Sequence, residues 1–146
     1  MIRKATVSDL EQLCILERRC FEKRRFSREH IRWLLENPDV ASYVYCNREK
    51  VVASVVLMRM GRTGKVVSLG VDPDYRRRGI AKHLMGLGEK EMRNRGVISM
   101  HLEVGIANEA AIELYKCLGY ETVRRIPEYY SWGEDAFTMT KRMSRL

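Results

Sequence analysis

The chain contains two kinds of hydrophobic pattern. In some stretches apolar and polar residues alternate, and in the stretches between them apolar residues recur every three or four positions. The first pattern predicts strands and the second predicts amphipathic helices, so a mixed α/β fold is expected. The expected strands are residues 2–5, 43–46, 51–58, 66–71, 97–104, 120–126 and 136–143. The expected helices run from the Thr6–Asp9 cap to about Cys20, from the Ser27 cap to Asn37-Pro38, over 79–95 and over 108–118.

Nothing in the sequence marks a boundary between domains, because the chain lacks internal repeats, low-complexity segments and Ser/Gly/Pro-rich linkers. We therefore expect residues 1–146 to form one domain. The longest apolar stretch, 51–58, is far shorter than the roughly 18 residues that indicate a membrane span. Residues 1–5 run straight into polar sequence without a signal segment, so we expect a cytoplasmic protein with no membrane partner.

The cysteines are scattered along the chain, without a C-x-x-C pair or a histidine at the spacing of metal ligands. They are Cys14, Cys20, Cys46 and Cys117. This arrangement predicts reduced, buried thiols and no metal site.

Basic residues outnumber acidic ones, with 27 Lys and Arg against 19 Asp and Glu and a net charge of +8. Such a balance favours an anionic partner such as a nucleotide, a nucleic acid or an acidic cofactor. The excess is concentrated in residues 51–100, which hold ten basic and four acidic side chains. A nucleic-acid-binding domain without catalytic activity is one interpretation. The sequence has no RNP, zinc or helix-turn-helix pattern, so specific nucleic-acid binding is not expected.

The strand expected at 66–71 and the helix expected at 79–95 are joined by a basic segment with small residues, Arg76-Arg77-Arg78-Gly79-Ile80-Ala81. Small residues let the backbone approach a ligand, and the unpaired N–H groups of a helix start bind phosphate. The three arginines suit a pyrophosphate. The segment is neither a Walker P-loop nor a G-x-G-x-x-G dinucleotide motif, and a solvated turn before an ordinary helix is the alternative interpretation.

The strand expected at 97–104 carries polar residues on one face. Alternation places Ile98, Met100, Leu102 and Val104 on one side, and Val97, Ser99, His101 and Glu103 on the other. Because burial raises the pKa of a carboxylate, Glu103 on a central strand is a candidate general base. The alternative interpretation is a surface ion pair, which an edge strand would favour. His101 is the local rival, because an imidazole titrates at about 6.5.

The segment Val66–Ala81, with its strand, Asp-Pro turn, [RQ]-x-x-G-x-[GA] and helix, resembles the acetyl-CoA-binding motif of the GNAT superfamily of N-acetyltransferases. Further matches follow in the order of that family: Leu102-Glu103-Val104, Asn108, Ala111-Ile112-x-Leu114-Tyr115 and Leu118-Gly119-Tyr120. The tail with Tyr129-Tyr130 and Glu134-Asp135-Ala136 resembles that of ribosomal-protein N-terminal alanine acetyltransferases and their archaeal relatives. The resemblance implies a GNAT fold, with a mixed central sheet of about seven strands that is splayed in the middle and about four flanking helices.

The resemblance also implies acetyl-CoA as cosubstrate, with its pantetheine arm lying in the notch between the splayed strands and pairing with residues 68–71. The thioester then lies beside Val71, whose backbone N–H would donate to the thioester carbonyl, and Gly70 allows a close backbone approach. The cofactor-binding residues expected from the family pattern are Leu69, Gly70, Val71, Arg76, Arg77, Arg78, Gly79, Ile80, Ala81, Lys82 and Asn108. Position alone predicts that Asn108 is also a helix N-cap.

For catalysis, the resemblance assigns the proton acceptor to Glu103, which would take a proton from the amine directly or through water, ahead of His101. It assigns Tyr115 as donor to the departing thiolate, although a half-buried packing role is the alternative for this tyrosine. Cys117 is expected to lie in the core, because its apolar neighbours suggest packing, so we expect direct transfer in a ternary complex without an acyl-enzyme.

The acceptor implied by the tail is a protein or peptide N-terminus. An α-amine has a pKa of about 7.7–8.0 and a lysine about 10.4, so one carboxylate base suits the α-amine better. The resemblance implies that Tyr129 and Tyr130 hold the peptide backbone, while the loop from Phe21 to Phe26, with Arg25, forms the opposite wall.

This loop departs from the family pattern, because Glu22-Lys23-Arg24-Arg25 replaces a segment that commonly carries Pro and few charges. The preferred first residue of the substrate is therefore left open. A basic wall would favour acidic residues downstream in the peptide or a position near ribosomal RNA, so ribosome association is possible, but a solvated loop without a role fits equally. The alternative activity is acetylation of a small amine or a lysine side chain, for which Lys23-Arg24-Arg25 is an unfavourable wall.

Overall fold

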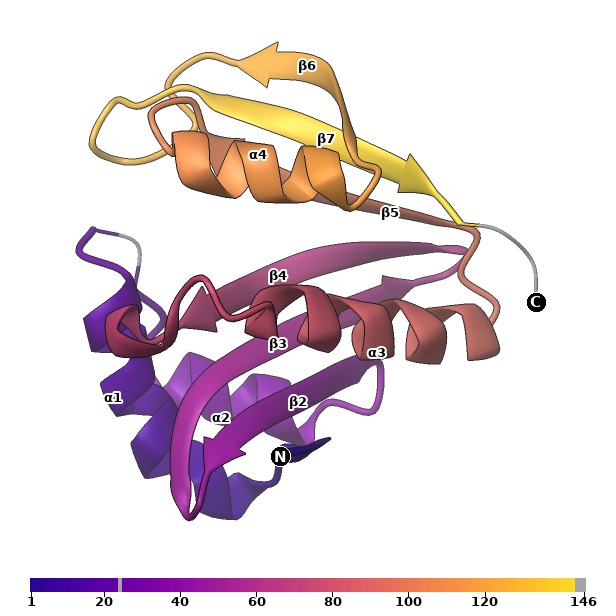
Figure 1. Ribbon diagram of the computed structural model, residues 1–146. Coiled ribbons are helices and arrows are strands. Elements are labelled where there is room, and N and C mark those ends of the chain that lie inside the picture. The colour runs from indigo at the N-terminus through magenta and orange to yellow at the C-terminus, as the bar shows by residue number, and fades with distance from the viewer. Residues whose placement is uncertain (24, 144–146) are drawn as a thin grey trace.

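In the part of the chain that the structure describes, seven strands form one mixed sheet with helices on both of its faces (Figure 1). The computed structural model describes residues 1–23 and 25–143. The strands, in the spatial order β1-β2-β3-β4-β5-β7-β6, are β1 (Ile2–Lys4), β2 (Val40–Asn47), β3 (Lys50–Met60), β4 (Thr63–Val71), β5 (Ser99–Gly105), β7 (Ala136–Arg142) and β6 (Glu121–Ile126). The helices are α1 (Leu10–Cys20), α2 (Arg28–Glu36), α3 (Ile80–Asn94) and α4 (Glu109–Cys117). This arrangement confirms the predicted splayed α/β fold.

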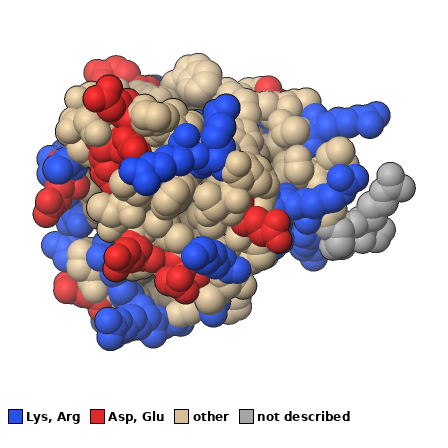
Figure 2. All heavy atoms as spheres, turned by 90° about the horizontal axis from the view of Figure 1, so that it is seen from above, with Lys and Arg blue, Asp and Glu red and all other residues tan. Residues whose placement is uncertain are grey.

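Two apolar cores lie on the two faces of the sheet. Helix α3 and Tyr115 of α4 pack on one face with Leu57, Met100 and Leu102, all of which are nearly inaccessible to solvent. Helices α1 and α2 cover the other face through Leu13, Ile31 and their neighbours. None of the helices in the described residues is long and apolar enough to cross a membrane. Seen from above, basic and acidic side chains are interspersed over the surface (Figure 2).

Local sequence signals explain several element ends. Ser27 accepts a hydrogen bond from the His30 N–H at 3.1 Å and so caps α2. Gly96 ends α3 with a φ of 89°, a conformation that costs other residues energy. The tight turn between Asn47 and Lys50 joins β2 to β3.

The alternation expected over residues 97–104 was wrong for its first two side chains. Strand β5 begins at Ser99, so the alternation does not extend to Val97 and Ile98: Val97 is buried, and Ile98 is 42% exposed. On α3 the buried stripe follows Leu84, Gly88 and Met92, and Leu87 beside it is 39% exposed.

The cysteines are free thiols, as expected, but only Cys46 is buried. Cys117 is exposed, which corrects the expectation of a core residue. The physical reason is its place on α4, two positions after the buried Tyr115 and therefore on the opposite side of the helix.

The central feature of the sheet is the separation of β4 from β5. Their parallel pairing covers three residue pairs, ending at Lys65 with His101. Beyond Lys65, β4 continues to pair with β3 as far as Val71 with Ala53, while β5 continues with β7. A bulge at Val67 shifts the β3–β4 register just after the separation begins. The two strand groups therefore diverge like an open V (Figure 1).

A buried polar contact ties the two strand groups together. Glu89 of α3, 5% exposed, accepts a hydrogen bond from the Tyr120 hydroxyl at 2.7 Å and from Lys141 Nζ at 2.8 Å. Burial and the neighbouring Glu89 carboxylate raise the pKa of Tyr120, so this phenol stays a hydrogen-bond donor. Since α3 packs on β2, β3 and β4, the contact fixes that group relative to β7 and to Tyr120, the residue that precedes β6.

Candidate active site

Two adjoining pockets open where β4 and β5 diverge. The first, of about 820 Å³, is called the basic pocket because Arg76, Arg77 and Lys82 line it. The second, of about 320 Å³, is called the acidic pocket because Glu22, Glu103 and Glu134 outnumber Lys23 among its charged lining residues. The pockets share Cys20, Phe21, Leu69, Asn108, Ala111 and Tyr115 and so form one continuous notch.

The basic pocket runs along an open edge of β4. The Asp72 N–H donates to Val52 O of β3 at 2.8 Å, so the preceding N–H, that of Val71, points the other way into the notch. The Val71 carbonyl on the same edge accepts from Arg76 Nε at 3.0 Å. An extended ligand that supplies its own acceptors could therefore bind beside Val71 as an additional strand would.

The turn that leads into α3 presents backbone N–H groups to the same pocket. Arg77 and Gly79 both have left-handed backbone conformations, with φ of 66° and 76°. Gly79 borders open space, because a Cβ built on it meets no heavy atom within 4 Å. The first turn of a helix combined with cationic side chains is a site for phosphate groups.

Asp72 holds the base of this turn. Asp72 is only 1% exposed. Its carboxylate accepts hydrogen bonds from Arg19 Nε at 2.7 Å and from the Asp74 N–H at 2.9 Å. The hydrogen bond from Arg19 is the main cause that keeps the pKa of Asp72 below its usual value.

All of the residues expected to bind the cofactor line the basic pocket except Arg78. The Arg78 guanidinium lies 5.0 Å from the centre of the Tyr75 ring and donates to Asp74 O at 3.4 Å. It borders a separate surface pocket with Tyr45 and Arg48. Stacking on Tyr75 therefore turns Arg78 away from the notch, which corrects its expected place.

Glu103 lines the acidic pocket from β5, and its side chain is 13% exposed. Lys65 Nζ of β4 lies 3.3 Å from Glu103 Oε1. An ion pair was the alternative interpretation of Glu103, more expected on an edge strand, but here it forms on a central strand, because the divergence of β4 and β5 starts beside this pair. His101 is not among the described residues that line either pocket.

Tyr115 and Asn108 lie where the two pockets meet. Tyr115 is 8% exposed, more buried than expected, and its ring packs edge-on against Tyr120 with centroids 5.8 Å apart. Asn108 Oδ1 accepts the Ala111 N–H at 3.2 Å, which confirms the predicted N-cap of α4.

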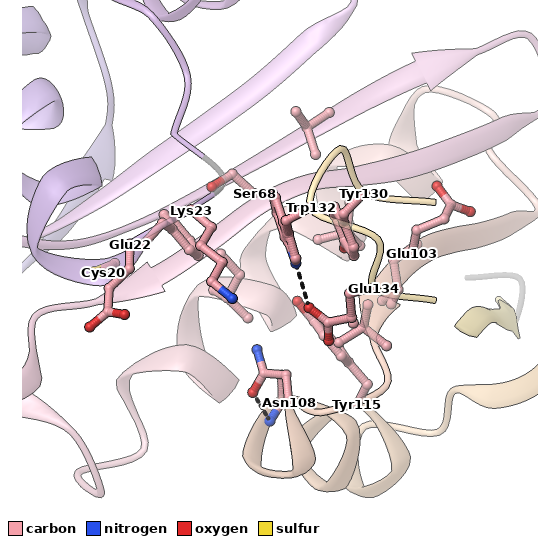
Figure 3. A pocket seen from close by; sticks show the side chains of 18 residues that line it. Cys20, Glu22, Lys23, Ser68, Glu103, Asn108, Tyr115, Tyr130, Trp132 and Glu134 are labelled. Atoms are coloured by element: carbon pink, nitrogen blue, oxygen red, sulfur yellow. Dashed lines mark hydrogen bonds between the residues drawn. The ribbon is translucent and has the colours of Figure 1, made fainter. Parts of the chain in front are cut away.

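A wall of the acidic pocket is made by residues that the sequence did not single out as a group. Trp132 stacks on Tyr130 at 4.6 Å, and its Nε1 donates to Glu134 Oε1 at 2.9 Å (Figure 3). The Ala107 N–H donates to Glu134 Oε2 at 3.1 Å. These two hydrogen bonds lower the pKa of Glu134, and the one from Trp132 has the larger effect. The sequence signal that could have identified this wall is the spacing of Trp132 two positions before Glu134, shortly after two tyrosines.

The residues expected to bind the acceptor are divided by the structure. Phe21 and Tyr130 line the acidic pocket. Tyr129 is 41% exposed and packs edge-on against Tyr130 outside the lining. Arg25 Nε donates to Phe21 O at 2.7 Å, which holds the loop but keeps Arg25 out of the pocket.

Phe26 packs against the core between α1 and α2, with its ring 4.6 Å from that of His30. Removing this apolar ring from water lowers the free energy of the folded chain. Arg24 lies outside the described residues. Within the described residues, no group of three His, Cys, Asp or Glu side chains could hold a metal ion.

The mixed sheet is splayed, and the notch has a helix start suited to phosphate groups on one side and the Glu103 carboxylate on the other. These features define the acyl-CoA N-acyltransferase class of folds. The chain matches the Acetyltransferase (GNAT) family over residues 9–120 and belongs to that family.

Individual relatives agree with this assignment. An N-alpha-acetyltransferase of Sulfurisphaera tokodaii is 31% identical over 150 residues, which cover 94% of this chain and 90% of that protein. A second N-alpha-acetyltransferase, of Saccharolobus solfataricus, is 41% identical over 81 residues, which are 55% of this chain but only 48% of that relative. The crystal structure of the ribosomal-protein-S18-alanine N-acetyltransferase from Escherichia coli superposes with a TM-score of 0.90 at 26% identity, covering 100% of this chain and 95% of that one.

Proposed function

We propose that the protein transfers the acetyl group of acetyl-CoA to the α-amino group of a protein or peptide N-terminus. The observation that carries this proposal is the notch itself, in which a basic pocket and an acidic pocket meet at Tyr115 and Asn108. The basic pocket suits a phosphate-bearing thioester, and the acidic pocket suits an amine. The names of the archaeal relatives and of the Escherichia coli structure agree with this acceptor.

On the cofactor side, three observations support a fit to acetyl-CoA. The β4 edge at Leu69–Val71 is open, the turn before α3 offers N–H groups, and Arg76, Arg77 and Lys82 add positive charge. The Val71 N–H would donate to the thioester carbonyl and stabilise the negative charge that its oxygen gains, a contribution of about 3 kcal/mol for one such donor. The thioester supplies the activated acetyl group, and the chain orients it.

On the acceptor side, Glu103 would accept the proton that the ammonium must lose, either directly or through one water molecule. Tyr115, at the junction of the pockets, would donate to the sulfur as it leaves. Because these groups face one notch from β5 and α4, the amine could attack the thioester directly, and no covalent acetyl-enzyme is needed.

The place of action forms a further part of the proposal. Ribosomal proteins and nascent chains present free N-termini at the ribosome, whose RNA would attract a protein with a net charge of +8. We propose that the enzyme works in the cytoplasm near ribosomes, through general electrostatic attraction and without specific nucleic-acid recognition.

A peptide panel with acetyl-CoA tests the proposal. One set carries free α-amines with varied first residues, a second set is N-blocked and contains lysine, and spermidine represents small amines. We expect acetylation of at least one free α-amine peptide, at a kcat/KM at least tenfold above that of the blocked peptides and spermidine. Faster acetylation of spermidine or of the blocked lysine peptides would establish the alternative activity.

A further inference from the structure

We infer that Glu134 forms an anionic subsite that binds the acceptor's α-amine in its ammonium form, before Glu103 removes the proton. This inference rests on the proposed function and adds a substrate-binding group to it.

The Glu134 carboxylate is held in place from two sides. Trp132 Nε1 donates to Oε1 and the Ala107 N–H donates to Oε2, at 2.9 and 3.1 Å. Each carboxylate oxygen can accept about two hydrogen bonds, so both oxygens retain capacity for a ligand. Gly105 of β5 makes room for this arrangement, because a Cβ at that position would collide with Glu134 Oε2.

The chemistry of Glu134 suits binding better than proton transfer. Its two N–H donors favour the charged form and lower its pKa, so it remains a carboxylate and takes up protons poorly. Glu103 is contacted instead by Lys65, a flexible side chain that is 35% exposed and can move. One pocket thus offers a fixed anion and a less constrained carboxylate, which can divide binding and proton acceptance between them.

The chain already places a primary ammonium against this wall. Lys23 Nζ lies 5.9 Å from the centre of the Trp132 ring, and its charge contributes to the lowered pKa of Glu134. Figure 3 shows Lys23, Trp132 and Glu134 facing the same pocket. The stacked faces of Trp132 and Tyr130 beside a carboxylate provide the surroundings that cations prefer. Lys23 is exposed and can withdraw when a substrate amine arrives.

The acceptor's charge state makes such a subsite useful. With a pKa of about 7.7–8.0, most of an α-amine is protonated at neutral pH. A pocket that bound only the neutral amine would use a small part of the substrate. A pocket that binds the ammonium first and lets Glu103 deprotonate it there can use all of the substrate.

The test is a cycle of two proteins and two ligands. The proteins, both saturated with CoA, are the wild type and Glu134→Gln, and the ligands are a peptide acetylated in the panel and its des-amino analogue, in which hydrogen replaces the α-amine. Calorimetry should show that the wild type binds the amino peptide at least tenfold more tightly than the analogue. In Glu134→Gln the difference should fall to within about twofold, with the affinity of the analogue unchanged.

Two other outcomes overturn the inference. If Glu134→Gln keeps the tenfold preference, Glu134 does not bind the ammonium. If both ligands lose affinity equally, Glu134 only supports the loop through Trp132 and Ala107. The control is Glu121→Gln, which removes an exposed charge on β6 outside the lining residues and should keep the tenfold preference.

A second variant keeps the inference testable should Glu134→Gln fold poorly. Lys23→Met removes the resident ammonium and should strengthen binding of the amino peptide about threefold while leaving the analogue unaffected. No gain for the amino peptide would count against the subsite. If the wild type acetylates none of the peptides, the proposed function fails; if it acetylates them but the cycle shows no coupling, only this inference fails.

Discussion

The two pockets of the notch differ in charge and meet in a region that has none. Arg76, Arg77 and Lys82 line the basic pocket without an acidic partner among the described lining residues, whereas the acidic pocket holds three carboxylates and one lysine. The six shared residues are Cys20, Phe21, Leu69, Asn108, Ala111 and Tyr115. All six are uncharged at neutral pH, and burial raises the pKa of the Cys20 thiol further. The notch therefore carries opposite charges at its two ends and uncharged residues where the two pockets join.

The pockets also share a device, because a carboxylate fixes the backbone of each. Asp72 accepts the Asp74 N–H below the phosphate-type turn, and Glu134 accepts the Ala107 N–H beside the end of β5. Both have a lowered pKa, for which a side-chain donor is the main cause. Each pocket is therefore held by an acid that remains charged, although the charged lining residues of the two pockets are mainly of opposite sign.

The sharpest way to separate the pockets is Glu103→Gln. Because this variant lacks the proton acceptor, its kcat should be lower than that of the wild type by a factor of about 10² to 10⁴. The affinity for acetyl-CoA should stay within twofold, since Glu103 does not line the basic pocket. Steady-state kinetics and calorimetry measure the two quantities. His101→Gln is the matched control and should retain activity within about threefold; a larger loss there, with Glu103→Gln unaffected, would move the base to His101.

The reverse change is Gly79→Trp, which targets the basic pocket alone. An indole at a φ of 76° is strained and projects beside the phosphate-type turn, so acetyl-CoA should bind up to about a hundredfold more weakly. Binding of the des-amino peptide in the acidic pocket should not change. Gly86→Trp, on the exposed side of α3 with no heavy atom within 4 Å of its Cβ, is the control. Equal weakening by both variants would assign the effect to α3 as a whole.

The pockets also differ in how far the sequence predicts them. Most of the basic pocket comes from one continuous segment, 69–82, whose strand, turn and helix are local patterns that a sequence records. Arg78 was misplaced because its stacking on Tyr75 depends on which way a turn residue points, and periodicity does not specify that direction.

The acidic pocket collects residues from the end of α1 and the segment after it, β4, β5, α4 and the loop before β7, so its wall depends on tertiary packing. Tyr130 was expected there, but Trp132 becomes part of the site only through its stacking and its bond to Glu134. Phe26 was misplaced for the same reason, because the sequence does not say which of two nearby aromatic rings enters the core. Local patterns thus predict pockets built from one segment better than pockets assembled from several.

The smallest expected effect concerns the acid that supports the basic pocket. Asp72→Asn leaves Arg19 without its buried anionic partner and should lower the free energy of unfolding at pH 7 by about 2 kcal/mol. Asp74→Asn is the control, because that side chain is 76% exposed and its pair with Arg19 contributes little.

The pH dependence follows from the lowered pKa of Asp72. A carboxyl whose pKa is lower in the folded chain stabilises the fold fully above its unfolded pKa, ordinarily 3.8 for Asp, and loses that contribution as pH falls through the folded value. The difference between wild type and Asp72→Asn should therefore be constant near neutrality and shrink below about pH 4. Urea unfolding at several pH values measures it. A difference that persisted undiminished at pH 2 would mean that the charge of Asp72 is not what holds the turn, and the parallel with Glu134 would fail.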